Sequence, residues 1–297
     1  MTQFGTKRVA FGRLAFNLCG PVGDQYFERA AGRLHENRLW LAVLSAMKNE
    51  AKAIVDVGAN IGFTVSLAAR RVPRARIVAI EPSSTAYECL CRTIAINDFV
   101  NVTAVHAFMS SEDKTVYFKE RAGNLAASGL AGLSGGGERI VCRSIDSLAQ
   151  ELKLPPIDLM KVDVEGHELS VLEGIQQSEP APIVVAEFSP LQIMGATRRL
   201  PIDFLGKIRA RFGEFYYVGN SRKSLHVRET DDLSDVLAVN IQEDGGIGDM
   251  VFSADRERFN RVISHKAVRS LPGPRGQRAI VARTPRNLFR FFAGTLR

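Results

Sequence analysis

The chain has 297 residues, of which 45% are hydrophobic and 24% are charged; this composition is typical of a globular protein and excludes a disordered or fibrous one. No apolar run approaches the roughly 18 residues that a membrane-spanning helix needs. Basic residues interrupt the apolar N-terminus, which does not match a secretory signal peptide, and the four cysteines form no C-x-x-C pair. We therefore expect a cytoplasmic protein with reduced thiols.

The net charge of +7 is concentrated near the C-terminus. Ten Lys or Arg residues and no Asp or Glu occur from Arg258 onward, which leaves 29 basic against 32 acidic residues, or −3, in residues 1–257. We predict a basic C-terminal extension over residues 256–297. Its aromatic and basic end, from Phe289 to Arg297, favours peripheral contact with an anionic membrane surface, with a solvated terminus as the alternative. A nucleic-acid partner is the weaker hypothesis, because the extension contains no recognised binding module.

The first 50 residues are predicted to be a helical segment, with one helix over residues 24–48. Asp24 can cap its start, and apolar residues recur at helical spacing as far as Met47. Trp40, the only tryptophan, is expected to pack against a sheet. A role in covering the ligand is the alternative.

Residues 54–62, IVDVGANIG, predict a buried parallel strand that ends in a glycine turn. Gly58 and Gly62 free the backbone to turn tightly and to approach a ligand, and a helix is expected from residue 61 to residue 70. A strand, a glycine turn and a helix start in this order can form a cradle for a nucleotide cofactor. An ordinary strand-to-helix connection is the alternative. The predicted cofactor-binding residues of this cradle are Asp56, Gly58, Ala59, Asn60 and Gly62.

Glu81 stands at the carboxyl end of the next predicted strand, residues 77–80. In doubly wound sheets, a carboxylate about 20 residues after a glycine turn binds the ribose hydroxyls of an adenosine ligand. The turn lacks the Gly-x-Gly-x-x-Gly pattern of dinucleotide-binding proteins, and Asp56 would repel a pyrophosphate but attract the ammonium of a methionine moiety. The sequence therefore favours S-adenosylmethionine (SAM) over NAD, and an NAD-dependent oxidoreductase or epimerase is the alternative.

The alternation of helices and strands that a parallel α/β sheet requires continues beyond this point. Ser110 follows the third strand and is a candidate for contact with adenine, with a solvated turn as the alternative. Residues 121–138 are rich in Gly, Ser and Ala, which indicates either a flexible loop or a lid over the substrate. Further strands are predicted over residues 102–108, 115–118 and 139–143.

The pattern K-x-D-x-E-G-x-E-x-x-x-L at residues 161–172 is more restrictive than the glycine turn. A strand over residues 157–164 leads into it, and an extended backbone would place Asp163, Glu165 and His167 on one face. A carboxylate or a His within hydrogen-bond reach of an acceptor hydroxyl can take its proton. We therefore predict that Asp163 and Glu165 bind the acceptor or act as the base, with His167 as a weaker alternative base.

Glu187 ends the strand predicted over residues 183–186, and it joins the same group if that strand neighbours the previous one. Lys161, a charged residue in an otherwise buried strand, needs a partner, which Asp163 or Glu165 can supply. Clustered carboxylates can also bind a divalent cation that polarises a hydroxyl. No ligand spacing demands a metal, so we predict none.

Four stretches, VDVGANIG, AIEPS, SIDSL and DLMKVDVEGHELSVLEGI, together resemble the FkbM-type SAM-dependent methyltransferases over roughly residues 52–190. The resemblance implies a class I SAM-methyltransferase fold, that is, a Rossmann-like, mostly parallel α/β sheet with helices on both faces. It also implies SAM as the cofactor and methyl transfer to a hydroxyl of a sugar, glycan or natural product. It favours a structural or site role for Asp146, which can also cap the helix that follows it. We place the methyltransferase domain at residues 51–255.

The remainder of the chain is predicted to close the sheet. An amphipathic helix is expected over residues 201–212. The loops 190–200 and 242–250 are predicted to contribute acceptor specificity. Closing strands are predicted over residues 215–218, 225–227 and 236–239.

Overall fold

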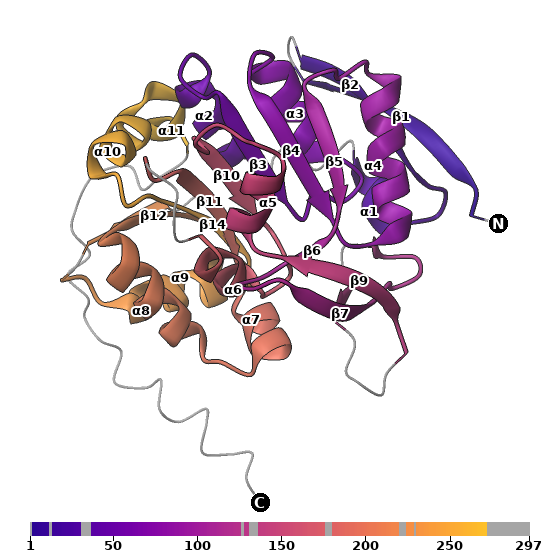
Figure 1. Ribbon diagram of the computed structural model, residues 1–297. Helices are drawn as coiled ribbons and strands as arrows, with labels where there is room; N and C mark the ends of the chain where they lie inside the picture. Colours follow the sequence, from indigo (N-terminus) through magenta and orange to yellow (C-terminus); the bar gives the residue numbers. More distant parts are fainter. Residues whose placement is uncertain are drawn as a thin grey trace, which may run out of the picture.

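The computed structural model describes residues 2–11, 14–30, 37–125, 128–130, 136–175, 180–219, 224–228 and 230–271. At its centre is an eight-stranded sheet in the order β13-β12-β14-β11-β10-β3-β4-β5 (Figure 1). The strands of this sheet are β3 (Ala53–Val57), β4 (Arg76–Glu81), β5 (Val102–His106), β10 (Leu159–Val162), β11 (Ile183–Phe188), β12 (Phe215–Gly219), β13 (Ser224–Val227) and β14 (Gly248–Phe252).

The direction of the strands defines where a ligand can bind. The neighbours β11, β10, β3, β4 and β5 are parallel, and β14 is inserted antiparallel between β11 and β12. Because β4 and β5 extend the sheet on one side of β3, and β10 and β11 extend it on the other, the winding reverses between β3 and β10. This mostly parallel, Rossmann-like sheet is the class I fold predicted from the sequence, and its switch point is the expected ligand crevice.

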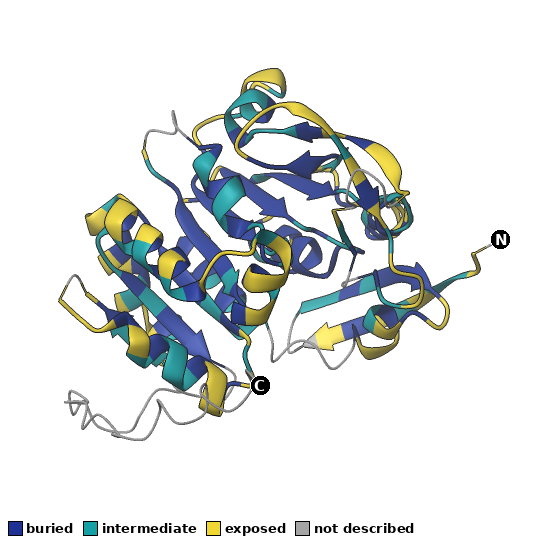
Figure 2. Cartoon of the chain, turned by 90° about the horizontal axis from the view of Figure 1, so that it is seen from below, coloured by how far each residue is buried: buried dark blue, intermediate teal, exposed yellow. Residues whose placement is uncertain are grey.

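Helices cover both faces of the sheet, and most of its strands are buried (Figure 2). Side chains that alternate along a strand enter opposite halves of the core, so Ile54 packs on one face and Val55 on the other. The first face is covered by α2 (Arg38–Met47), α3 (Phe63–Arg71), α4 (Ser84–Ile96), α10 (Arg256–Ser264) and α11 (Lys266–Arg269). The second face is covered by α5 (Ile145–Glu151), α6 (Glu168–Glu173), α7 (Pro190–Thr197), α8 (Pro201–Phe212) and α9 (Leu233–Glu243).

The N-terminal segment is not wholly helical, which corrects the prediction. It begins with a hairpin whose second strand docks on α4. In this contact Cys19 N donates a hydrogen bond to Thr93 Oγ1 at 2.9 Å, and Phe16 and Leu18 are buried. This docking removes apolar surface from water. The helical pattern of the sequence does not predict the hairpin. Within the predicted helix 24–48, one helix ends at Arg29 and another begins at Arg38, and residues 31–36 lie outside the described residues. The elements of this segment are β1 (Phe4–Phe11), β2 (Leu14–Pro21), α1 (Gln25–Arg29) and then α2.

A second, four-stranded sheet in the order β6-β9-β7-β8 lies beside the end of β5. Phe108, which the sequence placed in the third strand of the main sheet, belongs to this second sheet because β5 already ends at His106. Its inner face is a small apolar cluster that includes Phe108 and Phe118. The strands are β6 (Phe108–Met109), β7 (Lys114–Lys119), β8 (Gly129–Leu130) and β9 (Glu138–Arg143).

Residues 236–239 lie inside α9 and not in a strand, so that prediction is wrong. Leu233, Val236 and Asn240 are buried at helical spacing, and the side chain of Asp232 accepts a hydrogen bond from the backbone at the helix start. The apolar pair Val236 and Val239 fits either period, and the cap selects the helix. The closing strand is β14, immediately after.

Two helix starts also differ from prediction. The loop predicted over residues 190–200 contains α7, which begins at Pro190, a residue suited to the first helical position. Ser144, and not Asp146, caps α5, because Ser147 N donates to Ser144 Oγ at 3.2 Å. α7 therefore replaces a loop at the carboxyl edge of the sheet.

The first part of the predicted C-terminal extension is packed on the domain. α10 and α11 lie against α2 and bury Phe259, Val262 and Val268. Residues 272–297, with the aromatic and basic end, lie outside the described residues. In the part of the chain that the structure describes, no helix is long and apolar enough to cross a membrane.

Candidate active site

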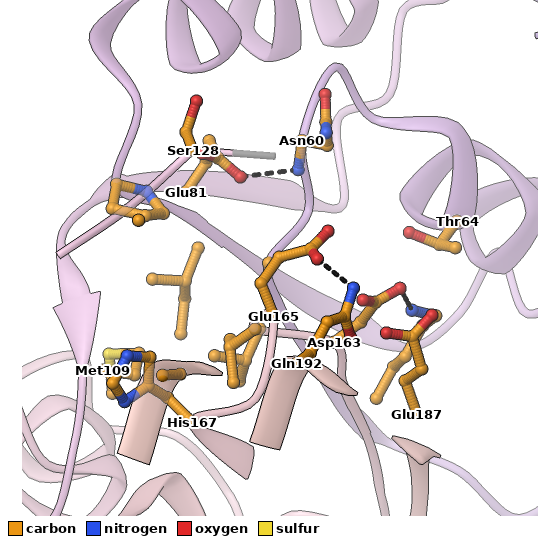
Figure 3. Close-up of a pocket in the computed structure, with 18 of the residues that line it drawn as sticks. Asn60, Thr64, Glu81, Met109, Ser128, Asp163, Glu165, His167, Glu187 and Gln192 are labelled. Carbon is orange, nitrogen blue, oxygen red and sulfur yellow. Dashed lines mark hydrogen bonds and ion pairs between the residues drawn. The ribbon is translucent and has the colours of Figure 1, made fainter. Parts of the chain in front are cut away.

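A cavity of about 940 Å³ opens at the carboxyl ends of β3, β4, β10 and β11, where the winding of the sheet reverses. The small sheet closes one side of it, and α2 and α7 contribute to the others. Its size is at the upper end of small-molecule sites, which suffices for a cofactor and a second ligand. Figure 3 shows Glu81 with Asn60 at one end, Asp163 and Glu187 close together, and His167 beside Met109.

The glycine turn is held against the segment that follows β10. Gly58 has φ of +84°, and a Cβ atom at this position would stand 1.8 Å from the carbonyl oxygen of Asp163. In the same contact Asp163 N donates to Val57 O at 3.0 Å. A glycine is therefore required both by the left-handed backbone and by the close approach of the two segments. The two sequence motifs meet at this contact.

Glu81 lies at the end of β4, as predicted, and lines the cavity. Its Oε2 accepts a hydrogen bond from Asn60 N at 2.7 Å, and its Oε1 accepts one from Ser83 N at 2.8 Å. These bonds fix the carboxylate beside the glycine turn. Burial raises the pKa of Glu81 to about 7, although both backbone donors act in the opposite direction.

Asp56 lies behind the cavity wall and not in it. Its side chain is fully buried, and neither carboxylate oxygen has a hydrogen-bond partner of good geometry. In the β3–β10 pairing Asp56 stands opposite Lys161, whose ammonium opposes the effect of burial; burial is larger and raises the pKa of Asp56 to about 6. Asp56 therefore contributes to the electrostatic potential of the crevice from within the sheet, and it does not line the cavity.

The predicted cofactor residues divide into two groups. Gly58, Asn60 and Glu81 line the cavity, whereas Asp56, Ala59, Gly62 and Ser110 are outside its lining. Gly62 faces α4, where an added Cβ would approach Leu90 and Thr93 to 3.0 and 3.2 Å. Ser110 N donates to Arg143 O at 2.9 Å, which ties β6 to β9. Met109, one residue earlier, is the group that faces the crevice.

The segment after β10 turns, which corrects the prediction of an extended backbone. Glu165 has φ of +55° and Gly166 has φ of +98°. Asp163, Glu165 and His167 nevertheless all line the same cavity, and Glu187 joins them from β11. The turn is held by Glu168, whose Oε1 accepts hydrogen bonds from Val164 N and Gly166 N, each at 3.1 Å. Sequence reasoning gave Glu168 no role.

The charged groups of the site lie together and interact electrostatically. Lys161 Nζ donates to Asp163 Oδ2 at 2.7 Å, and the ammonium is almost fully buried. Burial, together with the neighbouring carboxylate of Asp163, raises the pKa of Glu187 well above its usual range, and Glu187 Oε2 has no hydrogen-bond partner. Burial lowers the pKa of His167, which packs edge-on against Phe108. Burial thus makes Glu187 more basic than an exposed glutamate and favours the neutral form of His167.

Several lining residues carried no signal in the sequence. Gln192 on α7 donates to the carboxylate of Glu165, and Asp249 stands opposite Glu187 in the β11–β14 pairing. Trp40, predicted to pack against the sheet, does so and also reaches the cavity wall, where its indole donates to Thr64 O at 3.1 Å. An apolar wall faces these polar groups. Its members are Ala107, Phe108, Met109, Phe118, Leu125 and Leu130.

Residues 56–208 match the methyltransferase FkbM domain family. The chain belongs to that family. Membership of this family supports SAM over NAD as the cofactor, and the NAD-dependent alternative is not retained. Among the residues that the structure describes, no group of three or more His, Cys, Asp or Glu side chains is arranged to hold a metal ion.

Two fungal relatives align with part of this FkbM-domain chain. Methyltransferase sdnD of Sordaria araneosa is 33% identical over 156 residues, which cover 42% of this chain and 60% of the relative. Methyltransferase 1 of Beauveria bassiana (strain ARSEF 2860) is 27% identical over 143 residues, which cover 41% and 57%. The alignments thus span about three fifths of the length of these curated relatives.

Solved structures show a more distant likeness. An O-methyltransferase from Bacillus cereus in complex with SAH has a TM-score of 0.41 at 13% identity, with 78% of this chain and 89% of that chain covered. M. jannaschii TYW2 in complex with AdoMet has a TM-score of 0.41 at 14% identity, with 84% of both chains covered. At these scores the likeness does not bear on the site.

Proposed function

We propose that this protein transfers the methyl group of SAM to a hydroxyl group of a sugar, glycan or natural product. The observation that carries the proposal is the meeting of two kinds of group in one cavity. The glycine turn and Glu81 are at one end, and Asp163, Glu165, Glu187 and His167 line the remainder. A site of this kind both binds an adenosine ligand and offers bases for a hydroxyl proton.

The residues at the glycine turn fit the cofactor. When bound, SAM supplies an electrophilic methyl group on a sulfonium. Glu81 is placed to accept hydrogen bonds from the ribose hydroxyls, since each of its oxygens has a further lone pair. Asp163 lines the cavity directly beside Gly58 and is better exposed than Asp56 to hold the methionine ammonium. In this proposal Asp163 makes the contact with the methionine ammonium that the sequence had assigned to Asp56.

The remaining groups suit the acceptor. A hydroxyl must lose its proton during or just after attack, so a base within hydrogen-bond reach accelerates transfer. His167 is neutral near pH 7 because burial lowers its pKa, and it can therefore accept that proton. Glu165, oriented by Gln192, and Glu187 are the other candidates. Alignment of the acceptor oxygen with the methyl carbon supplies the larger share of the rate.

The charge of the cavity favours an uncharged or amine-bearing acceptor. Five carboxylates line it, and among its described lining residues Lys161 is the only Lys or Arg. That ammonium is already paired with Asp163. A phosphate or a carboxylate on the acceptor would meet several like charges at short range and no free cation among these residues. Neutral sugars, amino sugars and polyketide hydroxyls therefore fit better than sugar phosphates.

Titration calorimetry with SAM and, separately, with NAD tests the cofactor assignment. We expect SAM alone to bind, and Glu81→Ala to weaken its binding by about 1–3 kcal/mol because the ribose hydroxyls lose their acceptor. Glu257→Ala, at an exposed position on α10, is the matched control. Unchanged SAM affinity in Glu81→Ala would remove the ribose assignment, and binding of NAD in place of SAM would contradict the proposed function.

A further inference from the structure

The solvent side of α7 is apolar where a surface helix is normally polar. Leu191 is 77% exposed and Met194 is 46% exposed, while Ile193 packs into the core. By helical spacing Leu191, Met194 and Gly195 share one face, and Gly195 lines the cavity. The apolar surface of α7 is therefore continuous with the cavity mouth. Figure 1 shows α7 at the edge of the molecule, beyond the carboxyl ends of the parallel strands.

Exposed apolar side chains concentrate at this mouth. The described part of the chain has eleven exposed large hydrophobic residues. Two of them, Leu130 and Ile247, line the cavity, and two more lie on α7. Four of the eleven thus line the cavity or lie on α7, a helix of the cavity wall, which exceeds the scattered exposure expected of an ordinary surface. We name this group the mouth rim; its members are Leu130, Leu191, Met194 and Ile247.

Cations accompany the rim. Arg198 and Arg199 directly follow α7, and both are exposed. Arg199 reaches Glu173 only at 4.0 Å, at the limit of an ion pair. Large apolar side chains beside two arginines are the combination that holds a protein at an anionic lipid surface. A protein partner would need a standard interface of about 800 Å² per side with polar groups to pair, whereas the exposed face of α7 offers apolar side chains and no hydrogen-bonding group.

We propose that the mouth rim docks this methyltransferase on an anionic membrane surface. The arginines contact lipid phosphates, and Leu191 and Met194 insert among the acyl chains. The acidic interior repels lipid phosphates, so the headgroups stay at the rim while a hydroxyl on a membrane-held acceptor enters. The inference rests on the proposed function only in placing the acceptor at this mouth. It is independent of residues 272–297.

Co-sedimentation of the full chain with vesicles tests the proposal. Vesicles of phosphatidylcholine alone are compared with vesicles that also contain phosphatidylserine. We expect salt-sensitive binding to the anionic vesicles. The double variant Leu191→Ser with Met194→Ser should partition at least about tenfold more weakly, since burial of one such side chain is worth about a factor of ten. Arg198→Gln should weaken binding about fivefold.

The matched control is Val100→Ser, because Val100 is 98% exposed and lies away from the cavity lining; it should bind vesicles as the parent does. If the parent chain does not bind anionic vesicles, the lipid assignment is overturned and a protein partner takes its place. If the double variant binds as the parent does, the docking surface lies elsewhere and the proposal also fails. Calorimetry with SAM on the same proteins separates this outcome from failure of the proposed function, because neither substituted residue lines the cavity.

Discussion

Two carboxylates of the site that are close in sequence have different partners, and the partners indicate different roles. Asp163 and Glu165 lie two residues apart, yet one is paired with a buried ammonium and the other with the amide of Gln192. Asp163 Oδ2 lies 2.7 Å from the Lys161 ammonium. Glu165 is held by a neutral donor in a left-handed turn, which points its carboxylate into the cavity. The first arrangement suits a cation ligand, and the second suits contact with a hydroxyl.

Conservative substitutions can separate these two roles. Asp163→Asn should weaken SAM binding, because the ammonium of the methionine end loses its counter-charge. Glu165→Gln should leave SAM affinity near that of the parent and, if Glu165 is the base, should lower methyl transfer about a hundredfold or more. Calorimetry and a transfer assay on an accepted hydroxyl substrate measure the two effects. If both variants transfer at the parent rate, the base is His167 or Glu187.

The buried carboxylate of Glu168 should make the free energy of unfolding depend on pH. It is buried, and burial raises its pKa to about 7 from an ordinary value of 4.5. The folded chain therefore binds more protons than the unfolded chain between pH 4.5 and 7, so stability from this group is present below pH 4.5 and is lost as the pH rises through 7. Glu168→Gln lacks this loss. Relative to the parent, its free energy of unfolding should rise by about 2 kcal/mol between pH 5 and pH 8.

Urea denaturation without SAM at the two pH values measures this difference. The control is Glu257→Gln, whose side chain is 87% exposed and whose curve should stay parallel to that of the parent. Parallel curves for Glu168→Gln as well would show that Glu168 is ionised throughout this range.

At the scale of elements, the turn after β3 and the turn after β10 act as one unit. The contact between Gly58 and the Asp163 carbonyl leaves no room for a side chain. Gly58→Ala should destabilise the fold by about 2–4 kcal/mol, through the left-handed backbone and the clash together. Gly123→Ala is the matched control, because Gly123 has a similar φ of +78° with nothing within 4 Å of an added Cβ. It should show only the backbone cost of about 1 kcal/mol.

Chemical denaturation of the two variants separates backbone strain from the clash. Equal losses would mean that the two turns move apart without cost, and that the glycine is needed only for its backbone angle.

The elements that sequence predicted well are those in which a short pattern determines the structure. An apolar run before a glycine turn specified β3, and a carboxylate after an apolar run located Glu81 at the end of β4. The incorrect predictions of secondary structure have two physical causes. Val236 and Val239 fit both a strand and a helix, and the cap at Asp232 decides. The N-terminal hairpin is stabilised by docking on α4, a contact 74 residues away in the chain, which no local pattern can reveal.

At the scale of the whole molecule, the candidate site is assembled from distant segments by the sheet topology. The predicted groups on β3, β4, β10 and β11 meet because parallel strands end at one edge. Asp249 and Gln192 could not be predicted, since β14 reaches the site only by its antiparallel insertion beside β11 and α7 was expected to be a loop. The sequence thus located the edge of the sheet at which the cavity opens, and it left the outer wall of that cavity undetermined.

The packing of α10 gives a prediction for the whole fold. Arg258 Nη2 donates to Asp158 Oδ1 at 2.6 Å, and Asp158 Oδ2 accepts from Lys52 N and Ala53 N at 2.7 and 3.2 Å. One buried carboxylate therefore joins α10 to the starts of β3 and β10. Removing one partner leaves the other charge buried, so Arg258→Ala should cost about 3 kcal/mol or more of unfolding free energy.

Arg261→Ala provides the control on the same helix. Its partners Glu257 and Glu50 are exposed surface carboxylates at 3.0 and 3.6 Å, so its loss should stay within about 1 kcal/mol. Thermal and urea denaturation compare the two variants, and a cycle with Asp158→Asn should recover part of the Arg258→Ala loss as coupling energy. SAM affinity should be retained in every folded variant, because α10 contributes no residue to the cavity lining. If both arginine variants were equally stable, α10 would be an appendage, and the domain would end near residue 255, where the sequence had placed its boundary.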